Sequence, residues 1–215
     1  MKVLIGTPSY TGQLHAFYVD SLINTIKVCS KVGIDIYHLF VCFDALVQRA
    51  RNDLFKIAYN DGFDYLFFID SDMVWNPQDF LRLINHRKDI VLGAYRQKTD
   101  EREVYTFRVK ENPKIGGDLV EIDSGGFGFM CISKETIKKM YETAPEYTNG
   151  DIKNRLVSSV EILEGEFTGE DILFCKKWAA LGGEVFLDKK IALGHIGEKI
   201  FGGDVNKLFE LEKDK

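Results

Sequence analysis

Tyr65-Leu66-Phe67-Phe68-Ile69-Asp70-Ser71-Asp72 decides the fold, because this stretch joins an apolar run to a pair of carboxylates. A short apolar run with Gly62 before it and Pro77 after it is typical of a buried central strand. Open α/β sheets bind ligands just outside the carboxyl ends of their strands, where Asp70 and Asp72 are expected to lie. Two carboxylates this close repel each other, which favours a divalent cation between them and a diphosphate. The alternative for this D-x-D triplet is an Asx turn or a helix cap.

Strand-like and helix-like segments alternate through the first hundred residues. We expect strands at 3–6, 34–43, 65–69 and 90–95, and helices at about 13–31, 46–58 and 77–86. This order predicts an α/β fold with a mostly parallel, Rossmann-like central sheet that is flanked by helices. The second half has a different texture. Short strands at 104–109 and 119–122 predict a small antiparallel element, helices follow from about 134 and from 168, and a polar loop is expected through residue 155.

Composition limits the classes of function. The net charge of −5 argues against a nucleic-acid partner or an anionic membrane surface, and no apolar run is long enough to enter a membrane. The four cysteines show neither close pairing nor metal-finger spacing, so we expect reduced, buried thiols and a cytoplasmic protein. Met1 leads directly into a strand, without a signal peptide. The charged ending 208–215 is expected to form a helix that leads into a further domain of a longer protein.

Polar residues follow the first three predicted strands. Thr7-Pro8, Asp44 and the Asp70–Asp72 triplet come after strands one, two and three, so in a parallel sheet they meet at one edge. Asp44 there accepts a hydrogen bond from a base N–H or a ribose hydroxyl. The alternative role for Asp44 is to cap the helix that begins near Leu46.

Basic residues open the second predicted helix. Arg49, Arg51 and Asn52 are placed to pair with a diphosphate or to stack on a base. The alternative is that the arginines are solvated surface residues or partners of the nearby Asp53. Further along the chain, Gly125 and Gly126 would let the backbone approach a sugar closely, and the alternative for these glycines is a bulged, tightly packed strand.

Five short motifs together resemble the GT-A-fold glycosyltransferases, close to family 2, over nearly the whole chain. They are Gly6-Thr7-Pro8-Ser9, Ala50-Arg51-Asn52, Phe67-Phe68-Ile69-Asp70-Ser71-Asp72, Gly169-Glu170-Asp171 and Gly194-His195. The likeness extends to the amino-terminal domain of a large chlorovirus-encoded glycosyltransferase, which would make this a viral protein of the host cytoplasm. The resemblance implies one GT-A domain over 1–215, with a nucleotide-binding half at 1–100 and an acceptor and catalytic half at 101–215.

The resemblance also implies the ligands and the residues that bind them. The donor would be a nucleoside-diphosphate sugar, with a UDP-sugar expected first, and the acceptor a glycan hydroxyl. Mn²⁺ or Mg²⁺ would be held by Asp70, Asp72 and His195, and an imidazole ligand favours Mn²⁺. The nucleotide-sugar site would comprise Thr7, Pro8, Ser9, Tyr10, Asp44, Arg49, Arg51, Asn52, Asp70, Ser71, Gly125 and Gly126.

The catalytic base is expected in the pair Glu170-Asp171, with Asp171 preferred. A carboxylate on the acceptor side removes the hydroxyl proton, and one base opposite the leaving group favours inversion at the anomeric carbon. Two alternatives stay open for Asp171. The pattern Thr168-Gly169-Glu170-Asp171 fits a capping box, so Asp171 would satisfy first-turn amides, and either acid would otherwise only bind the acceptor.

Two other classes of function fit parts of the sequence. Four apolar residues followed by Asp70-Ser71-Asp72 also match the haloacid-dehalogenase-type phosphohydrolases, in which Asp70 would be the nucleophile and Asp72 the acid/base. That motif usually opens its domain, whereas two strand–helix units precede it here. A non-catalytic nucleotide-sugar-binding module is the second alternative, and it leaves the candidate base and metal ligands without a role.

Overall fold

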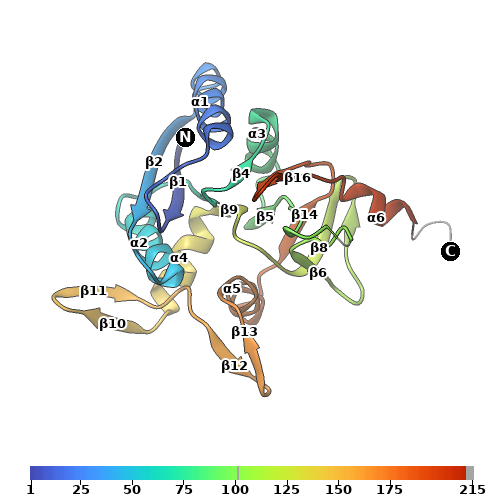
Figure 1. Cartoon of the computed structure of the whole chain (residues 1–215). Helices are drawn as coiled ribbons and strands as arrows, with labels where there is room; N and C mark the ends of the chain where they lie inside the picture. Colours follow the sequence, from blue (N-terminus) through green and yellow to red (C-terminus); the bar gives the residue numbers. More distant parts are fainter. Residues whose placement is uncertain (101, 212–215) are drawn as a thin grey trace.

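A computed structural model describes residues 1–100 and 102–211 of the chain (Figure 1). Its six helices are α1 (Ala16–Lys31), α2 (Val47–Asn60), α3 (Pro77–Asn85), α4 (Lys134–Thr143), α5 (Glu170–Ala180) and α6 (Asn206–Leu211). The strands of the main sheet are β1 (Lys2–Ser9), β2 (Asp35–Cys42), β3 (Tyr65–Ile69), β5 (Ile90–Leu92), β6 (Phe107–Val109), β7 (Ile115–Gly116), β8 (Leu119–Gly125), β9 (Phe129–Ser133) and β14 (Val185–Asp188).

The main sheet has the order β2-β1-β3-β9-β5-β14-β8-β6, with β7 paired to β8. β1 pairs in parallel with β2 and β3, and β14 pairs in parallel with β5. β9 is antiparallel to both of its neighbours, β3 and β5, and β8 is antiparallel to β14. Most strands of the sheet therefore run in one direction, as predicted, and the two reversed strands, β8 and β9, come from the second half of the chain.

Three smaller sheets complete the fold. β4 (Met73–Val74), β15 (Gly194–Ile196) and β16 (Ile200–Phe201) form a three-stranded sheet next to the carboxylate triplet. β10 (Glu146–Asn149) pairs with β11 (Ile152–Arg155), and β12 (Glu161–Leu163) pairs with β13 (Glu166–Thr168). Figure 1 shows these two hairpins projecting from the helices around them. The polar loop expected through residue 155 is therefore wrong, because residues 146–155 form a hairpin.

Side chains that alternate along the central strands pack on opposite faces of the sheet. Leu66 and Phe68 of β3 join the core under α2, α4 and α5, whereas Phe67 and Ile69 join the core under α1 and α3. All four side chains are fully buried. Helices thus cover both faces of the sheet, as the sequence predicts, and the carboxylates after Ile69 emerge from the best-packed part of the molecule.

Local sequence signals explain several element boundaries. Asn76 accepts a hydrogen bond from the Gln78 amide at 2.9 Å, and Pro77 takes the first position of α3, where proline is favoured. β1 continues to Ser9, so Thr7 and Pro8 lie inside a strand and not in the expected turn.

Several other expectations concern the termini, the thiols and the membrane. α6 supports the expected C-terminal helix as far as Leu211, and residues 212–215 lie outside the described residues. The four cysteines are free thiols, but Cys42 is exposed, contrary to the expected burial. Within 1–100 and 102–211, no helix has the length and apolar character needed to cross a membrane.

Candidate functional site

The triplet Asp70-Ser71-Asp72 occupies the turn between β3 and β4. Main-chain hydrogen bonds to two other segments hold its backbone in place. The amide of Asp70 donates to the carbonyl of Gly128 at 3.2 Å, just before β9. The carbonyl of Asp72 accepts from the amide of Ile196 in β15 at 2.7 Å. Ser71 lies half-buried between them. Two segments from the second half of the chain therefore set the positions of both carboxylates.

Arg51 links Asp70 to the start of α5. Its guanidinium donates to Asp70 Oδ1 at 2.9 Å and to Glu170 Oε1 at 2.5 Å, and the side chain is only 4% exposed. The guanidinium carbon lies 4.4 Å from the ring centroid of Phe127. Burial alone would lower the pKa of Arg51, but the charges of Asp70 and Glu170 outweigh it and raise that pKa. Arg51 is thus a buried cation between two carboxylates, and neither a solvated surface residue nor a partner of Asp53.

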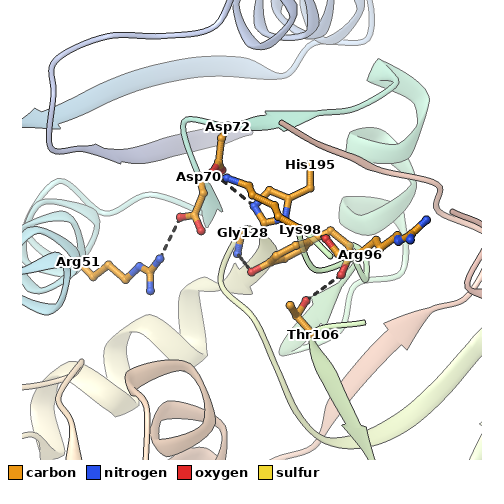
Figure 2. A network of polar contacts seen from close by, with 9 residues as sticks. Arg51, Asp70, Asp72, Arg96, Lys98, Thr106, Gly128 and His195 are labelled. Atoms are coloured by element: carbon orange, nitrogen blue, oxygen red, sulfur yellow. Dashed lines mark hydrogen bonds and ion pairs between the residues drawn. The ribbon is translucent and has the colours of Figure 1, made fainter. Parts of the chain in front are cut away.

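The second carboxylate, Asp72, faces a different pair of side chains. Figure 2 shows Lys98 and His195 converging on it. Lys98 Nζ lies 2.6 Å from Asp72 Oδ2, and His195 Nε2 lies 3.4 Å from the same oxygen. Burial raises the pKa of Asp72, but the contacts with His195 and Lys98 outweigh it and hold that pKa at about 2. Asp72 is therefore ionised across the whole physiological range.

A carbonyl behind His195 orients its imidazole. His195 Nδ1 lies 2.9 Å from the carbonyl oxygen of Arg96, which can only accept, so Nδ1 carries the proton of that hydrogen bond. In the neutral ring, Nε2 is then the unprotonated nitrogen, and it faces Asp72. The ring of Tyr95 meets the imidazole edge-on at a centroid distance of 5.0 Å. A carbonyl that fixes the tautomer in this way is common behind metal-binding histidines.

These observations test whether the residues fit a divalent cation. Asp72 Oδ2 and His195 Nε2 provide one anionic oxygen and one imidazole nitrogen that face each other. Asp70 is turned toward Arg51, and within the described parts of the chain no three acidic, histidine or cysteine side chains form a ready metal cluster. Mg²⁺-type sites often use one or two carboxylates and take their other ligands from water and substrate phosphates. The pair Asp72 and His195 fits such a site, with a nitrogen ligand that favours Mn²⁺.

The two acids at the start of α5 have different surroundings. Glu170 is ion-paired with Arg51, whereas Asp171 Oδ1 accepts a hydrogen bond from the Ile172 amide at 2.7 Å. Burial raises the pKa of Asp171, although the Ile172 amide partly offsets it. The capping box is not formed, because the Thr168 hydroxyl donates to the carbonyl of Glu166 and the cap position, Gly169, has no side chain. Asp171 does satisfy one first-turn amide.

A cavity of about 210 Å³ adjoins Asp171. Its lining residues come from the loop after β5, from β6, from the end of β8 and from the start of α5: Gln97, Tyr105, Thr106, Phe107, Arg108, Ser124, Gly125, Asp171 and Ile172. The buried hydroxyl of Ser124 has no hydrogen-bond partner within the described chain. The cavity therefore offers a small molecule the carboxylate of Asp171, whereas the Ser124 hydroxyl oxygen is buried in its wall.

Residues near the start of α2 border a second, larger cavity. It has a volume of about 470 Å³, and its walls include Arg49, Asn52 and Tyr147. Asp44 accepts two hydrogen bonds from Arg49, each at 2.8 Å, and one from the Leu46 amide at 2.9 Å. Asp44 thus binds the amide of Leu46, the N-cap residue of α2, but it is not itself the cap that the alternative predicts.

Several residues expected at the nucleotide are engaged within the protein. Asn52 exchanges two hydrogen bonds with the backbone of Ser158, at 2.9 and 2.7 Å. The Thr7 hydroxyl lies 2.5 Å from the Tyr18 hydroxyl, and the Ser9 hydroxyl donates to the Gln13 carbonyl at 3.0 Å.

The remaining candidates differ in exposure. Pro8 is half-buried and Tyr10 is 66% exposed. Gly125 lines the cavity beside Asp171. A Cβ at Gly126 would lie 2.3 Å from the Tyr95 hydroxyl, so this glycine is required for close packing.

Comparison with known proteins adds the family. Residues 46–148, from the start of α2 to the first hairpin, match the family model described as Glycosyl transferase family 2. This stretch resembles family 2 of the glycosyltransferases, and the fold of the chain is of the GT-A type. No curated protein matches it.

Among solved structures, A197 from STIV is similar to this glycosyltransferase, with 20% identity and a TM-score of 0.58. The alignment covers 92% of this chain and 86% of that one, and at this identity it shows the fold alone. A glycosyltransferase involved in the glycosylation of the major capsid of PBCV-1 aligns at 10% identity over 65% of this chain and 63% of that one, with a TM-score of 0.38. S. aureus TarS 1-349 in complex with UDP aligns at 17% identity over 87% and 57%, with a TM-score of 0.45.

The sequence analysis missed Lys98 and Arg96, although both lie in the site of this glycosyltransferase. They follow β5, the fourth strand of the predicted series, and only the ends of the first three strands were searched for polar residues. Arg96-Gln97-Lys98 is a polar triplet just past an apolar run. Extending the strand-end rule to that strand would have found it.

Proposed function

We propose that the protein transfers a sugar from a nucleoside-diphosphate sugar to a glycan hydroxyl in a reaction that depends on a divalent metal. UDP-sugars are the first donors to test. The observation that carries the proposal is the contrast between two carboxylates, Asp72 and Asp171. The contacts with His195 and Lys98 lower the pKa of Asp72, whereas Asp171 borders a cavity and burial raises its pKa. Two acids in such different environments suit two different roles.

On the donor side, Asp72 Oδ2 and His195 Nε2 would hold the ion. Arg51 takes Oδ1 of Asp70, which leaves Oδ2 as the oxygen through which Asp70 would reach the ion. When bound, Mn²⁺ or Mg²⁺ stabilises the negative charge on the departing nucleoside diphosphate. Arg51 orients Asp70 through its hydrogen bond to Oδ1. Because its guanidinium already pairs with two carboxylates, Arg51 would not bind the diphosphate directly. It would act by positioning Asp70.

On the acceptor side, Asp171 is the proposed base. The acceptor hydroxyl would enter the cavity of about 210 Å³ that Asp171 borders. Asp171 Oδ1 is held by the Ile172 amide, so the carboxylate has a fixed orientation at the rigid end of α5. Proton removal by one carboxylate opposite the leaving group would invert the anomeric centre. Glu170 is the weaker base candidate because its carboxylate is already ion-paired with Arg51.

A panel of nucleotide sugars tests the proposal. The protein is incubated with each donor and Mn²⁺ but without acceptor, and release of the nucleoside diphosphate is followed by chromatography, because water can replace the acceptor slowly. Release from at least one donor, abolished by EDTA and restored by Mn²⁺, is the expected result. Release that is unaffected by EDTA would overturn the metal requirement, and no release from any donor in the panel would overturn the donor assignment.

A further inference from the structure

Lys98 pairs with the carboxylate oxygen that the proposed metal ion would use. Its Nζ is 2.6 Å from Asp72 Oδ2, the oxygen that also faces His195 Nε2 at 3.4 Å. An ion bound to both that oxygen and that nitrogen would lie about 2.0–2.2 Å from each. An ammonium this close to the same oxygen would experience strong repulsion from the ion. The lysine and the ion therefore compete for one carboxylate.

The surrounding chain holds Lys98 in this position. The loop that carries it is closed by a hydrogen bond from the Gln97 amide to the Val104 carbonyl at 2.7 Å. The aliphatic part of Lys98 crosses Gly197, where an added Cβ would lie 3.2 Å from Lys98 Cδ. The absence of a side chain at Gly197 thus provides the space in which Lys98 reaches Asp72.

We propose that Lys98 is an internal cation that occupies the donor-metal site in the resting protein and leaves when a divalent ion binds. This inference rests on the proposed function, because it needs Asp72 and His195 to be metal ligands. Lys98 compensates the charge of Asp72 until the ion arrives. Its side chain is 36% exposed, so the ammonium has direct access to solvent once it is displaced.

Competition between Lys98 and the metal ion lowers the affinity of the protein for the ion by a measurable factor. Binding of the ion has to break the Lys98–Asp72 pair, and an ion pair that is partly shielded from solvent lowers the apparent affinity of its competitor by about three- to tenfold. Removal of the lysine charge should recover that factor. Methionine at position 98 keeps the length of the side chain, so that the effect reports the charge.

The test measures Mn²⁺ binding alone, without nucleotide or sugar, by electron paramagnetic resonance of the free ion. Lys98→Met should bind Mn²⁺ about three- to tenfold more tightly than the parent protein. Lys199→Met is the matched control. Lys199 pairs with Asp100 and lies over the Phe201 ring, so the change removes the same charge nearby without touching Asp72. The Lys199→Met dissociation constant should stay within about twofold of the parent value.

A second measurement ties the gain to the carboxylate. Lys98→Met combined with Asp72→Asn should bind Mn²⁺ no more tightly than Asp72→Asn alone. Equal affinity in the parent and Lys98→Met, with binding still dependent on Asp72, would overturn the role of Lys98 and leave the proposed function intact. Mn²⁺ binding that ignores Asp72 in every variant would overturn both this inference and the assignment of Asp72 as a metal ligand.

Discussion

Arg51 of α2 and Glu170 of α5 meet at 2.5 Å, although 119 residues separate them in the sequence. The guanidinium joins the helix that follows the second strand to the helix that carries the candidate base. Its other terminal nitrogen holds Asp70, so a single buried side chain connects the donor side of the site to the acceptor side. This link also distinguishes Glu170 from Asp171, because it commits Glu170 to Arg51.

The first prediction concerns the stability that this link provides. Arg51→Met leaves Asp70 and Glu170 facing each other without the cation, and breaking a buried pair costs about 3–5 kcal/mol. Because both carboxylates are partly exposed, we expect a loss of about 2–4 kcal/mol in the free energy of unfolding. Urea denaturation measures it.

Arg49→Met is the control for this experiment. Arg49 also pairs with an acid, Asp44, but on the surface, so its loss should change the urea midpoint only slightly. Combining Arg51→Met with Glu170→Gln should recover part of the loss, because the second change removes one uncompensated charge. A midpoint for Arg51→Met equal to that of Arg49→Met would contradict the structural role.

The second prediction concerns the base. Asp171→Asn should leave Mn²⁺ and nucleotide binding intact while it lowers sugar transfer by about 10²–10⁴-fold, the usual contribution of general-base catalysis. The asparagine Oδ1 can still accept from the Ile172 amide, so the melting temperature should change little. Glu170→Gln is the matched comparison, and its transfer rate should fall less. Transfer by Asp171→Asn at close to the parent rate would remove Asp171 from the role of base.

The third prediction is the pH dependence of the reaction. A base acts when it is deprotonated, and burial raises the pKa of Asp171 above the ordinary aspartate value of about 3.9. Activity should therefore fall on acidification, on the acid limb of the kcat/KM profile, with a midpoint above the pKa of an ordinary aspartate. The limb should be absent from the residual activity of Asp171→Asn. An unchanged limb in that variant would assign the titration to another group.

The fourth prediction concerns the donor. Asp72→Ala should abolish the Mn²⁺-dependent binding of UDP while the protein stays folded, because Asp72 lies in a turn after β3. Isothermal titration calorimetry with and without Mn²⁺ measures the binding, and circular dichroism checks the fold. Undiminished UDP binding by Asp72→Ala in the absence of metal would refute the assignment.

The fifth prediction separates this glycosyltransferase from the phosphohydrolases that share its carboxylate motif. Asp70 is ion-paired with Arg51, and in our proposal it never forms a covalent bond to phosphorus. Incubation with phosphomonoesters should give no aspartyl-phosphate by mass spectrometry and no release of inorganic phosphate. Asp70→Asn should weaken Mn²⁺ and donor binding instead. A trapped phosphoryl group on Asp70 would show that phosphoryl-transfer chemistry occurs there.

The sequence predicted much of the fold because local signals are strong in its first half. The apolar run before Asp70 and the Asn76-Pro77 start of α3 both act over a few residues, and the structure confirms both elements. The direction of β9 was not predictable, since the pattern of a buried strand is the same in either orientation.

Residues of the candidate site were predictable only where the side chain itself points to a role, as aspartate and histidine side chains point to metal binding. Asp70, Asp72 and His195 were predicted to lie together, and the structure brings them to the same edge of the sheet. The partners of Arg51 were not identified, because a buried arginine and a surface arginine look alike in a helical pattern. Pairings across 119 residues, such as Arg51 with Glu170, depend on tertiary structure and leave no local trace.

The position of β9 has a consequence for how this chain folds during synthesis. β9 lies between β3 and β5, and β14 lies on the other side of β5, so Ile69 pairs with Phe129 and Ile90 pairs with Val185. When the first hundred residues have left the ribosome, β9 has not yet emerged, so the edges of β3 and β5 that it later pairs with are still unpaired. We expect a fragment that ends at residue 100 to aggregate through these unpaired edges, and the intact chain to fold slowly, because its sheet closes only when the last of these strands has emerged.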